Sequence, residues 1–204
     1  MEDGTRPKGR TGDPALRRAV AFVALANLAY FGVEFAVARS IGSVSLFADS
    51  VDFLEDASIN LLILAALGWS TTARSRVGMV LAGILLVPSL AAVWTVLTKV
   101  ADPVPPAAVP LTLAGAGALA VNLACALVIA RHRRHGGSLV RAAFLSARND
   151  VLANVAIVAA GFVTAATLSG WPDLLVGAGI AVLNLDAARQ VWTLARREHL
   201  AVEA

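Results

Sequence analysis

Four carboxyl side chains fall within eight consecutive residues of a long apolar stretch. They are Asp49, Asp52, Glu55 and Asp56, and Asn60 follows one helical turn later. An Asp at the centre of a membrane-spanning helix costs about 2.5 to 3.5 kcal/mol, so four facing lipid would cost on the order of 10 kcal/mol. Acids kept at such depth usually bind cations or carry protons.

These polar side chains share one face if the stretch is helical. At about 100° per residue, Asp49, Asp52, Asp56 and Asn60 lie within about 80° of one another, with Glu55 just beside them. The stripe must therefore face protein or water.

A second polar stripe follows about ninety residues later, where Ser146, Asp150 and Asn154 recur at every fourth position and Asn149 lies beside Asp150. Both stripes fall near the middle of their apolar stretches. We therefore expect Asp52, Asp56 and Asp150 to meet near the centre of the bilayer.

Three clustered carboxylates bring like charges into a region of low dielectric constant, so protons or a metal ion must accompany them. The same oxygens can hold either, because metal binding requires deprotonated ligands. This competition predicts the exchange of a divalent cation for protons. Ligands that are oxygen alone favour hard ions, whereas zinc and cadmium sites commonly include His or Cys.

The composition indicates the elements that hold these residues. Of 204 residues, 58% are hydrophobic and only 15% are charged, and the mean hydropathy is +0.73. These values argue against a water-soluble enzyme and a disordered chain. We expect no nucleic-acid partner despite a pI near 9.7, because the basic residues lie mainly in connecting loops. The single Cys125 has no partner for an intrachain disulfide.

The sequence predicts an all-α polytopic membrane protein with six transmembrane helices. The expected spans are Leu16 to Ala38, Ile41 to Leu67, Val77 to Leu97, Val109 to Ala130, Val140 to Leu168 and Leu174 to Leu194. We expect a flexible cytoplasmic tail over residues 1–15, one transmembrane domain over 16–197 and a short cytoplasmic tail over 198–204.

Basic residues predict the orientation. Apart from Arg148 inside a span, only Arg39 and Lys99 lie in the connections of one side, whereas all other Lys and Arg lie on the opposite side. Because cytoplasmic loops carry the excess of basic residues, both termini should be cytoplasmic.

The two acidic motifs resemble the second and fifth helices of the cation diffusion facilitator family. The matching stretches are GSVSLFADSVDFLED from Gly42 to Asp56 and RNDVLAN from Arg148 to Asn154, together with Asn27 to Glu34 and Gly170 to Gly177. The resemblance implies six helices, cytoplasmic termini and proton-coupled export of zinc, cadmium, manganese, iron or cobalt. It also implies metal ligands at Asp52, Asp56, Ser146 and Asp150.

Two departures from the family pattern affect these expectations. Ser146 stands where the family commonly has His or Asp, and Asn149 or Asn154 offers a carbonyl oxygen instead. This weakens the case for zinc and leaves the metal open. Many members also continue into a cytoplasmic domain that helps them dimerise, whereas this chain ends soon after Leu194. We expect a transmembrane domain alone, and a homodimer and a separate soluble partner both stay open.

The remaining polar residues each have two interpretations. Asp49 and Glu55 suit an outer vestibule or proton path, or polar packing. Glu34 shares a face with Asn27 and Tyr30, which suits an ion path or, more simply, interhelical hydrogen bonds. Asn60 and Asn154 extend the two stripes as pathway candidates. His132 and His135 suit metal delivery, or contact with anionic lipid. For Asn122, Asn184 and Asp186 we expect helix-to-helix hydrogen bonds.

We therefore expect a secondary transporter, not an enzyme, that exports divalent transition-metal cations across the cell (plasma or inner) membrane by proton antiport. Asp52, Asp56 and Asp150 would be the ligands, with Ser146 and Asn149 as auxiliary groups. The metal is substrate, protons are the counter-ion, and no prosthetic group is expected. The alternatives are a proton-coupled exporter of small organic cations and a non-transporting membrane metal sensor or scaffold. An intramembrane aspartyl protease fits poorly, because a catalytic dyad needs only two acids.

Overall fold

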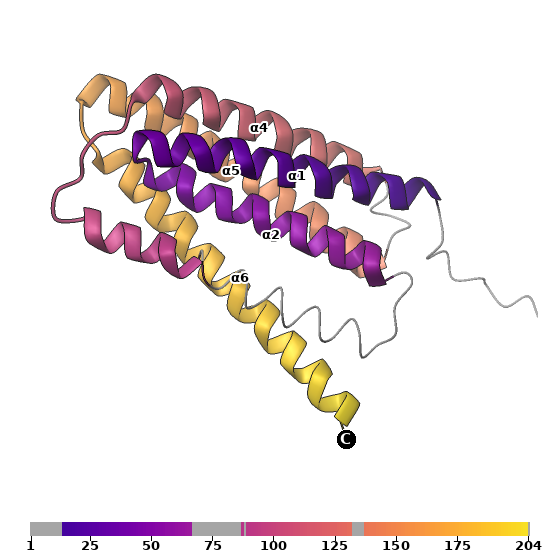
Figure 1. Cartoon of the computed structure of the whole chain (residues 1–204). Coiled ribbons are helices and arrows are strands. Elements are labelled where there is room, and N and C mark those ends of the chain that lie inside the picture. Colours follow the sequence, from indigo (N-terminus) through magenta and orange to yellow (C-terminus); the bar gives the residue numbers. More distant parts are fainter. Residues whose placement is uncertain (1–13, 67–86, 88, 132–136, 204) are drawn as a thin grey trace, which may run out of the picture.

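The computed structural model describes residues 14–66, 87, 89–131 and 137–203, and this part of the chain is helical with short connections and contains no strand. The helices are α1 (Pro14–Ile41), α2 (Val44–Ala66), α4 (Ala108–Ala130), α5 (Gly137–Thr167) and α6 (Trp171–Glu203), with a further helical segment over residues 89–99. They form an elongated bundle from which α6 projects beyond the other helices (Figure 1). The prediction of an all-α fold is confirmed.

The predicted spans agree with these helices at five of six places. Of the third span, Val77 to Leu97, residues 77–86 and 88 lie outside the described residues, and 89–97 are helical. Within the described chain, three helical stretches are long and apolar enough to cross a membrane: Pro14–Ile41, Ala108–Ala130 and Arg148–Thr167. Many large apolar side chains on the bundle surface are exposed, as a lipid environment requires.

The helix ends differ from the predicted span ends by up to about three residues, except at the end of α6, where the helix is longer. α1 already begins at Pro14, where a fixed φ favours the first helical turn. α6 continues to Glu203, so most of the predicted tail over residues 198–204 is helical. The apolar pattern locates the part of a helix that faces lipid, but a helix continues in water wherever its backbone hydrogen bonds persist.

The turn between α1 and α2 is stabilised by local chemistry. Gly42 has a φ of 68°, a left-handed conformation that suits glycine, and the Ser43 N–H donates to the Ala38 carbonyl at 3.1 Å. The Ser43 hydroxyl then accepts the Leu46 N–H at 3.1 Å, which caps the start of α2. The two helices therefore run antiparallel and pack along their length.

Asp173, near the start of α6, fastens α6 to the first turn of α2. Its carboxylate accepts the Val44 and Ser45 N–H groups at 2.7 and 3.1 Å and the Ser43 and Ser45 hydroxyls at 2.6 and 2.5 Å. The N–H groups of a first helical turn have no partner inside the helix, so a buried carboxylate there satisfies them and complements the helix dipole.

The connections predicted to lie outside the cell meet at this same end of the bundle. The Lys99 ammonium donates to the Gly42 carbonyl, and Gly170 lies against the backbone of Pro103 and Val104. Successive antiparallel helices place alternate connections at one end of a bundle, and these three connections have this arrangement.

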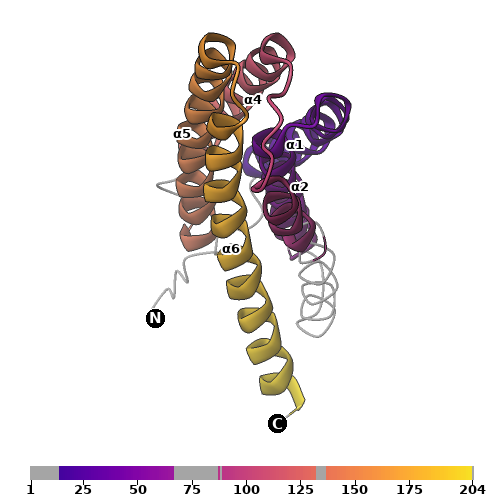
Figure 2. The same ribbon diagram turned by 90° about the vertical axis from the view of Figure 1, so that its left-hand side faces the viewer.

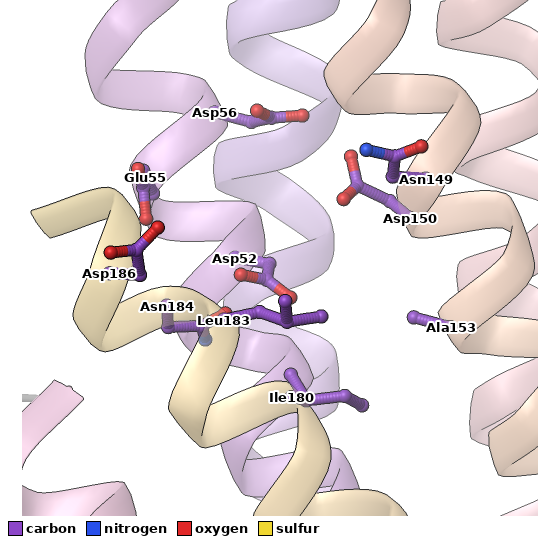
Figure 3. A pocket seen from close by; sticks show the side chains of 10 residues that line it. All are labelled: Asp52, Glu55, Asp56, Asn149, Asp150, Ala153, Ile180, Leu183, Asn184 and Asp186. Atoms are coloured by element: carbon purple, nitrogen blue, oxygen red, sulfur yellow. The ribbon is translucent and has the colours of Figure 1, made fainter. Parts of the chain in front are cut away.

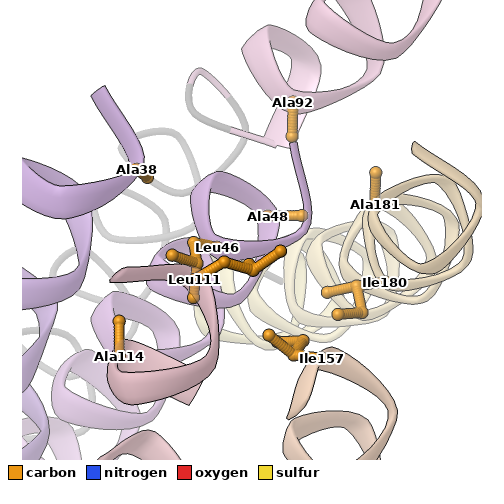
Figure 4. Packing of buried hydrophobic residues seen from close by; sticks show 9 residues of the cluster. All are labelled: Ala38, Leu46, Ala48, Ala92, Leu111, Ala114, Ile157, Ile180 and Ala181. Atoms are coloured by element: carbon orange, nitrogen blue, oxygen red, sulfur yellow. The ribbon is translucent and has the colours of Figure 1, made fainter. Parts of the chain in front are cut away.

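The helices associate as two pairs, α1 with α2 and α4 with α5, with α6 packed against α2 and α5 (Figure 2). Leu46 of α2, Leu111 of α4, Ile157 of α5 and Ile180 of α6 meet in the apolar core that joins the pairs (Figure 4). This core lies nearer the end that carries the α1–α2 turn, and a second apolar cluster around Val23, Cys125 and Ile129 lies between α1 and α4 toward the other end.

Candidate functional site

A cavity of about 250 Å³ opens between α2, α5 and α6 (Figure 3). Five of its ten lining residues are acids. The lining comprises Asp52, Glu55 and Asp56 of α2, Asn149, Asp150 and Ala153 of α5, and Ile180, Leu183, Asn184 and Asp186 of α6. The two acidic stripes that the sequence separates by about ninety residues therefore face one space.

Asp56 and Asp150 face each other across this cavity, from α2 and α5 (Figure 3). Asp52, one turn earlier on α2, adds a third carboxyl group to the same cavity wall. One oxygen of Asp150, Oδ2, is buried without a hydrogen-bond partner in the described part of the chain. Two carboxyl groups so placed must share a proton or bind a cation.

A chain of hydrogen bonds links Asp56 to helices α1 and α4. Asn27 of α1, which is fully buried, donates from Nδ2 to Asp56 Oδ2 across a long 3.5 Å. The Cys125 thiol of α4 donates in turn to Asn27 Oδ1 at 3.7 Å. The expected interhelical hydrogen bonds of this face are confirmed for Asn27 and also for Tyr30, whose hydroxyl donates to the Ala114 carbonyl at 2.6 Å.

Glu34, Asp49 and Asn154 do not line this cavity. Asn154 donates from Nδ2 to Asp49 Oδ2 at 2.6 Å and accepts at Oδ1 the amide of Asn122 at 3.0 Å. Glu34 of α1 lies opposite Asp49 of α2, at a level between the ring contacts of Tyr30 with Phe53 and of Phe35 with Phe47. Asn154 is thus directed at Asp49, away from the cavity where a substitute metal ligand would be needed.

Of the other candidate residues from the sequence, some line the cavity and others do not. Glu55 lines the cavity, whereas the Asn60 amide donates to the carbonyl of Asp56 on its own helix at 2.8 Å. Asn149 is exposed and lines the cavity; it accepts a 3.4 Å hydrogen bond from Arg148. Ser146 belongs to α5, but its side chain lies outside the described part, as do His132 and His135 entirely.

Asn184 and Asp186 of α6 also line the cavity, although the sequence predicted only helix packing for them. Asn184 does donate to the Ala48 carbonyl of α2 at 2.9 Å, so its packing role is confirmed. Asp186 is exposed. An acid near the predicted inner end of the sixth span is the sequence feature from which a place at the cavity could be predicted.

The cavity acids are spread around its walls. Across the described side chains, no group of three His, Cys, Asp or Glu is placed to hold one metal ion together. What the geometry offers is a facing pair, Asp56 and Asp150, with Asp52 one turn away.

Comparison with known proteins bears on the whole transmembrane part. A family model described as the cation efflux transmembrane domain matches residues 20–193. A search of the curated proteins found no match.

Proposed function

Because the chain belongs to the cation efflux family of membrane transporters, we propose that it exports divalent transition-metal cations from the cytoplasm in exchange for protons. The family membership is the premise. The class of metal, the direction of movement and the proton coupling are the proposal.

The observation that carries the proposal is the facing pair Asp56 and Asp150, with Asp52 beside it, at the wall of one cavity. We assign these three carboxylates as the metal ligands and proton carriers. Asn149 contributes an amide oxygen from the rim, and Ser146, one turn before Asp150 on α5, is the auxiliary group that the sequence predicts. All of these donors are oxygen, which suits hard and borderline divalent ions.

The exchange follows from the charge balance of the cavity. With no bound cation, the acids around the cavity hold protons, since several carboxylates cannot all be ionised together in a region of low dielectric constant. A divalent ion that enters must displace those protons, and protons that return from the other side of the membrane displace the ion. Helices α2 and α5 supply opposite walls, so rocking of one helix pair against the other would open the cavity to alternate sides.

The test is flux by the purified protein in proteoliposomes, with Mn²⁺, Fe²⁺, Co²⁺, Zn²⁺ and Cd²⁺ supplied singly under an imposed pH gradient. We expect flux of at least one metal, accelerated by an opposing proton gradient and accompanied by proton movement. Asp150→Asn should reduce it by about 10- to 100-fold, because it removes a ligand and a proton carrier. Asp102→Asn is the matched control, since Asp102 is exposed in the connection over residues 100–107.

Three outcomes would contradict the proposal. Unchanged flux in Asp150→Asn would remove this residue from the mechanism. Flux of small organic cations without metal dependence would favour the organic-cation exporter. Metal binding without any flux would favour a sensor or scaffold.

A further inference from the structure

The described structure contains a second pair of facing carboxyl groups, Glu34 of α1 and Asp49 of α2, outside the cavity. Both side chains have an exposed fraction of 0%. Both oxygens of Glu34 and Oδ1 of Asp49 lack a hydrogen-bond partner in the described chain if both acids are ionised. The two residues lie at the same level of the antiparallel helices α1 and α2, because the ring contacts of Tyr30 with Phe53 and of Phe35 with Phe47 flank them.

A proton bound to one of the two acids would give these buried oxygens a hydrogen-bond partner. Two buried carboxylates in contact repel each other, and each unpaired buried oxygen costs free energy. If Glu34 is protonated, its O–H donates to the free oxygen of Asp49, whose other oxygen already accepts the Asn154 amide at 2.6 Å. The pair then carries one negative charge in place of two.

Among the described residues, no cationic group is paired with Glu34 or Asp49 in place of this proton. The titratable groups that face the pair are Tyr30 of α1, Asp52 and Asp56 of α2, and Asp150 of α5. From α4, the Asn122 amide donates to Asn154, which in turn donates to Asp49. From α6, the Asn184 amide donates to the backbone carbonyl of Ala48. Within the described residues, neither Glu34 nor Asp49 has an ion pair with Lys or Arg.

The pair lies on the predicted outer side of the cavity. Asp49 is five residues into α2, or about 8 Å along its axis, whereas Asp52 and Asp56 are about 12 and 18 Å along it. Protons that drive export arrive from outside, so they would reach the depth of Glu34 and Asp49 before that of Asp56 and Asp150. At a spacing of about 5 to 10 Å in a poorly screened interior, a dication in the cavity acts electrostatically on the pair.

We propose that Glu34 and Asp49 form a proton-binding site, distinct from the metal cavity, that releases its proton when a divalent cation occupies the cavity. The inference rests on the proposed function for its coupling to metal, but the bound proton itself does not. The proton leaves Glu34 to water when the metal enters, and a proton from the outer side restores the acid when the metal leaves. Glu34 and Asp49 thereby add to the number of protons exchanged for each ion.

Infrared spectroscopy and calorimetry on the purified full chain test this proposal. The metal-free protein should show a carboxylic-acid carbonyl band that Glu34→Gln weakens, because the glutamine amide replaces the O–H donor toward Asp49. Addition of Mn²⁺ or Zn²⁺ should diminish that band in the unmutated protein. Calorimetry in buffers of different ionisation enthalpy should give about one fewer proton released per metal ion in Glu34→Gln, with metal affinity within about threefold of the unmutated value.

Two further variants make the result decisive. Asp49→Asn removes the other half of the pair, should give the same loss, and replaces Glu34→Gln if that variant fails to fold. Asp102→Asn neutralises an exposed acid and should change neither measurement. An unweakened acid band and an unchanged proton count in both pair variants would overturn the proposal. If the unmutated protein carries no metal, the proposed function fails, while the band in the metal-free protein still decides whether the pair holds a proton.

Discussion

At the scale of single residues, the acidic stripe of α2 faces two different sets of residues. Asp52 and Asp56 face the cavity between α2, α5 and α6, whereas Asp49 faces Glu34 of α1 and Asn154 of α5. A stripe that spans about 80° of a helix is wide enough for two adjacent helices to cover its edges. One polar face therefore holds two separate carboxyl pairs.

The sequence identified the residues of both pairs better than it identified their grouping. The sequence predicts that Asp52, Asp56 and Asp150 lie together, because acids at matching depth in apolar spans have few other partners. Periodicity alone groups Asn60 and Asn154 with them, whereas in the structure Asn60 donates to the backbone of its own helix and Asn154 donates to Asp49. Periodicity gives the direction of a side chain, but the neighbour that it meets depends on helix packing.

Asp186 supplies a prediction at this scale. It is an exposed acid on the cavity wall, so it should attract cations toward Asp52, Asp56 and Asp150 without being a ligand. Asp186→Asn should raise the metal concentration for half-maximal flux by about two- to fivefold at low ionic strength, with little effect on the maximal rate. Flux against metal concentration at two salt concentrations measures this. A lower maximal rate with an unchanged half-maximal concentration would mean that Asp186 acts in a later step.

At the scale of the helices, the contact between α2 and α6 decides where the cavity lies. Asp173 binds the first turn of α2, and Gly177, one turn further along α6, lies against the backbone of Val44 and Ser45. The two helices touch at this end, while Asp52 and Asp186 line the cavity further along. The partner of this glycine lies about 130 residues away along the chain, so local sequence patterns do not identify it.

Gly177 and Gly179 form a matched pair for a stability prediction. A Cβ at Gly177 would lie 2.7 Å from backbone atoms of Val44 and Ser45, whereas a Cβ at Gly179 would meet nothing within 4 Å. Gly177→Ala should destabilise the protein by about 1 to 3 kcal/mol through overpacking. Gly179→Ala should be neutral or stabilising by up to about 1 kcal/mol, since alanine favours a helix. Thermal unfolding in detergent compares the two, and equal midpoints would contradict the close contact of α6 with α2.

At the scale of the whole molecule, the two ends of the bundle are chemically different. The connections that carry Gly42, Lys99 and Gly170 meet at one end, and Arg131 follows α4 at the other. The all-helical fold and most helix positions could be predicted from hydropathy. The way the helices pair could not, because contacts such as that of Leu46 with Leu111 and Ile157 are long-range.

The orientation in the membrane gives the prediction for the whole molecule. Cys125 is the only cysteine and is buried, so a Cys125→Ala background is free of thiols. In that background, Asp102→Cys should react with a membrane-impermeant thiol reagent added outside intact cells. Arg131→Cys should react only after the membrane is permeabilised, because basic connections stay in the cytoplasm. The reverse labelling pattern would invert the orientation and, with it, the direction of export.

The long α6 has a mechanical consequence. Its 33 residues extend for about 50 Å, whereas the hydrocarbon layer of a membrane is about 30 Å thick. The portion from Asn184 to Glu203 therefore extends for about 28 Å beyond the cavity wall. A tilt of about 10° at that point would move the C-terminal end of α6 by about 5 Å. A small change around Asp52 and Asp150 would therefore become a larger displacement of α6 at the membrane surface.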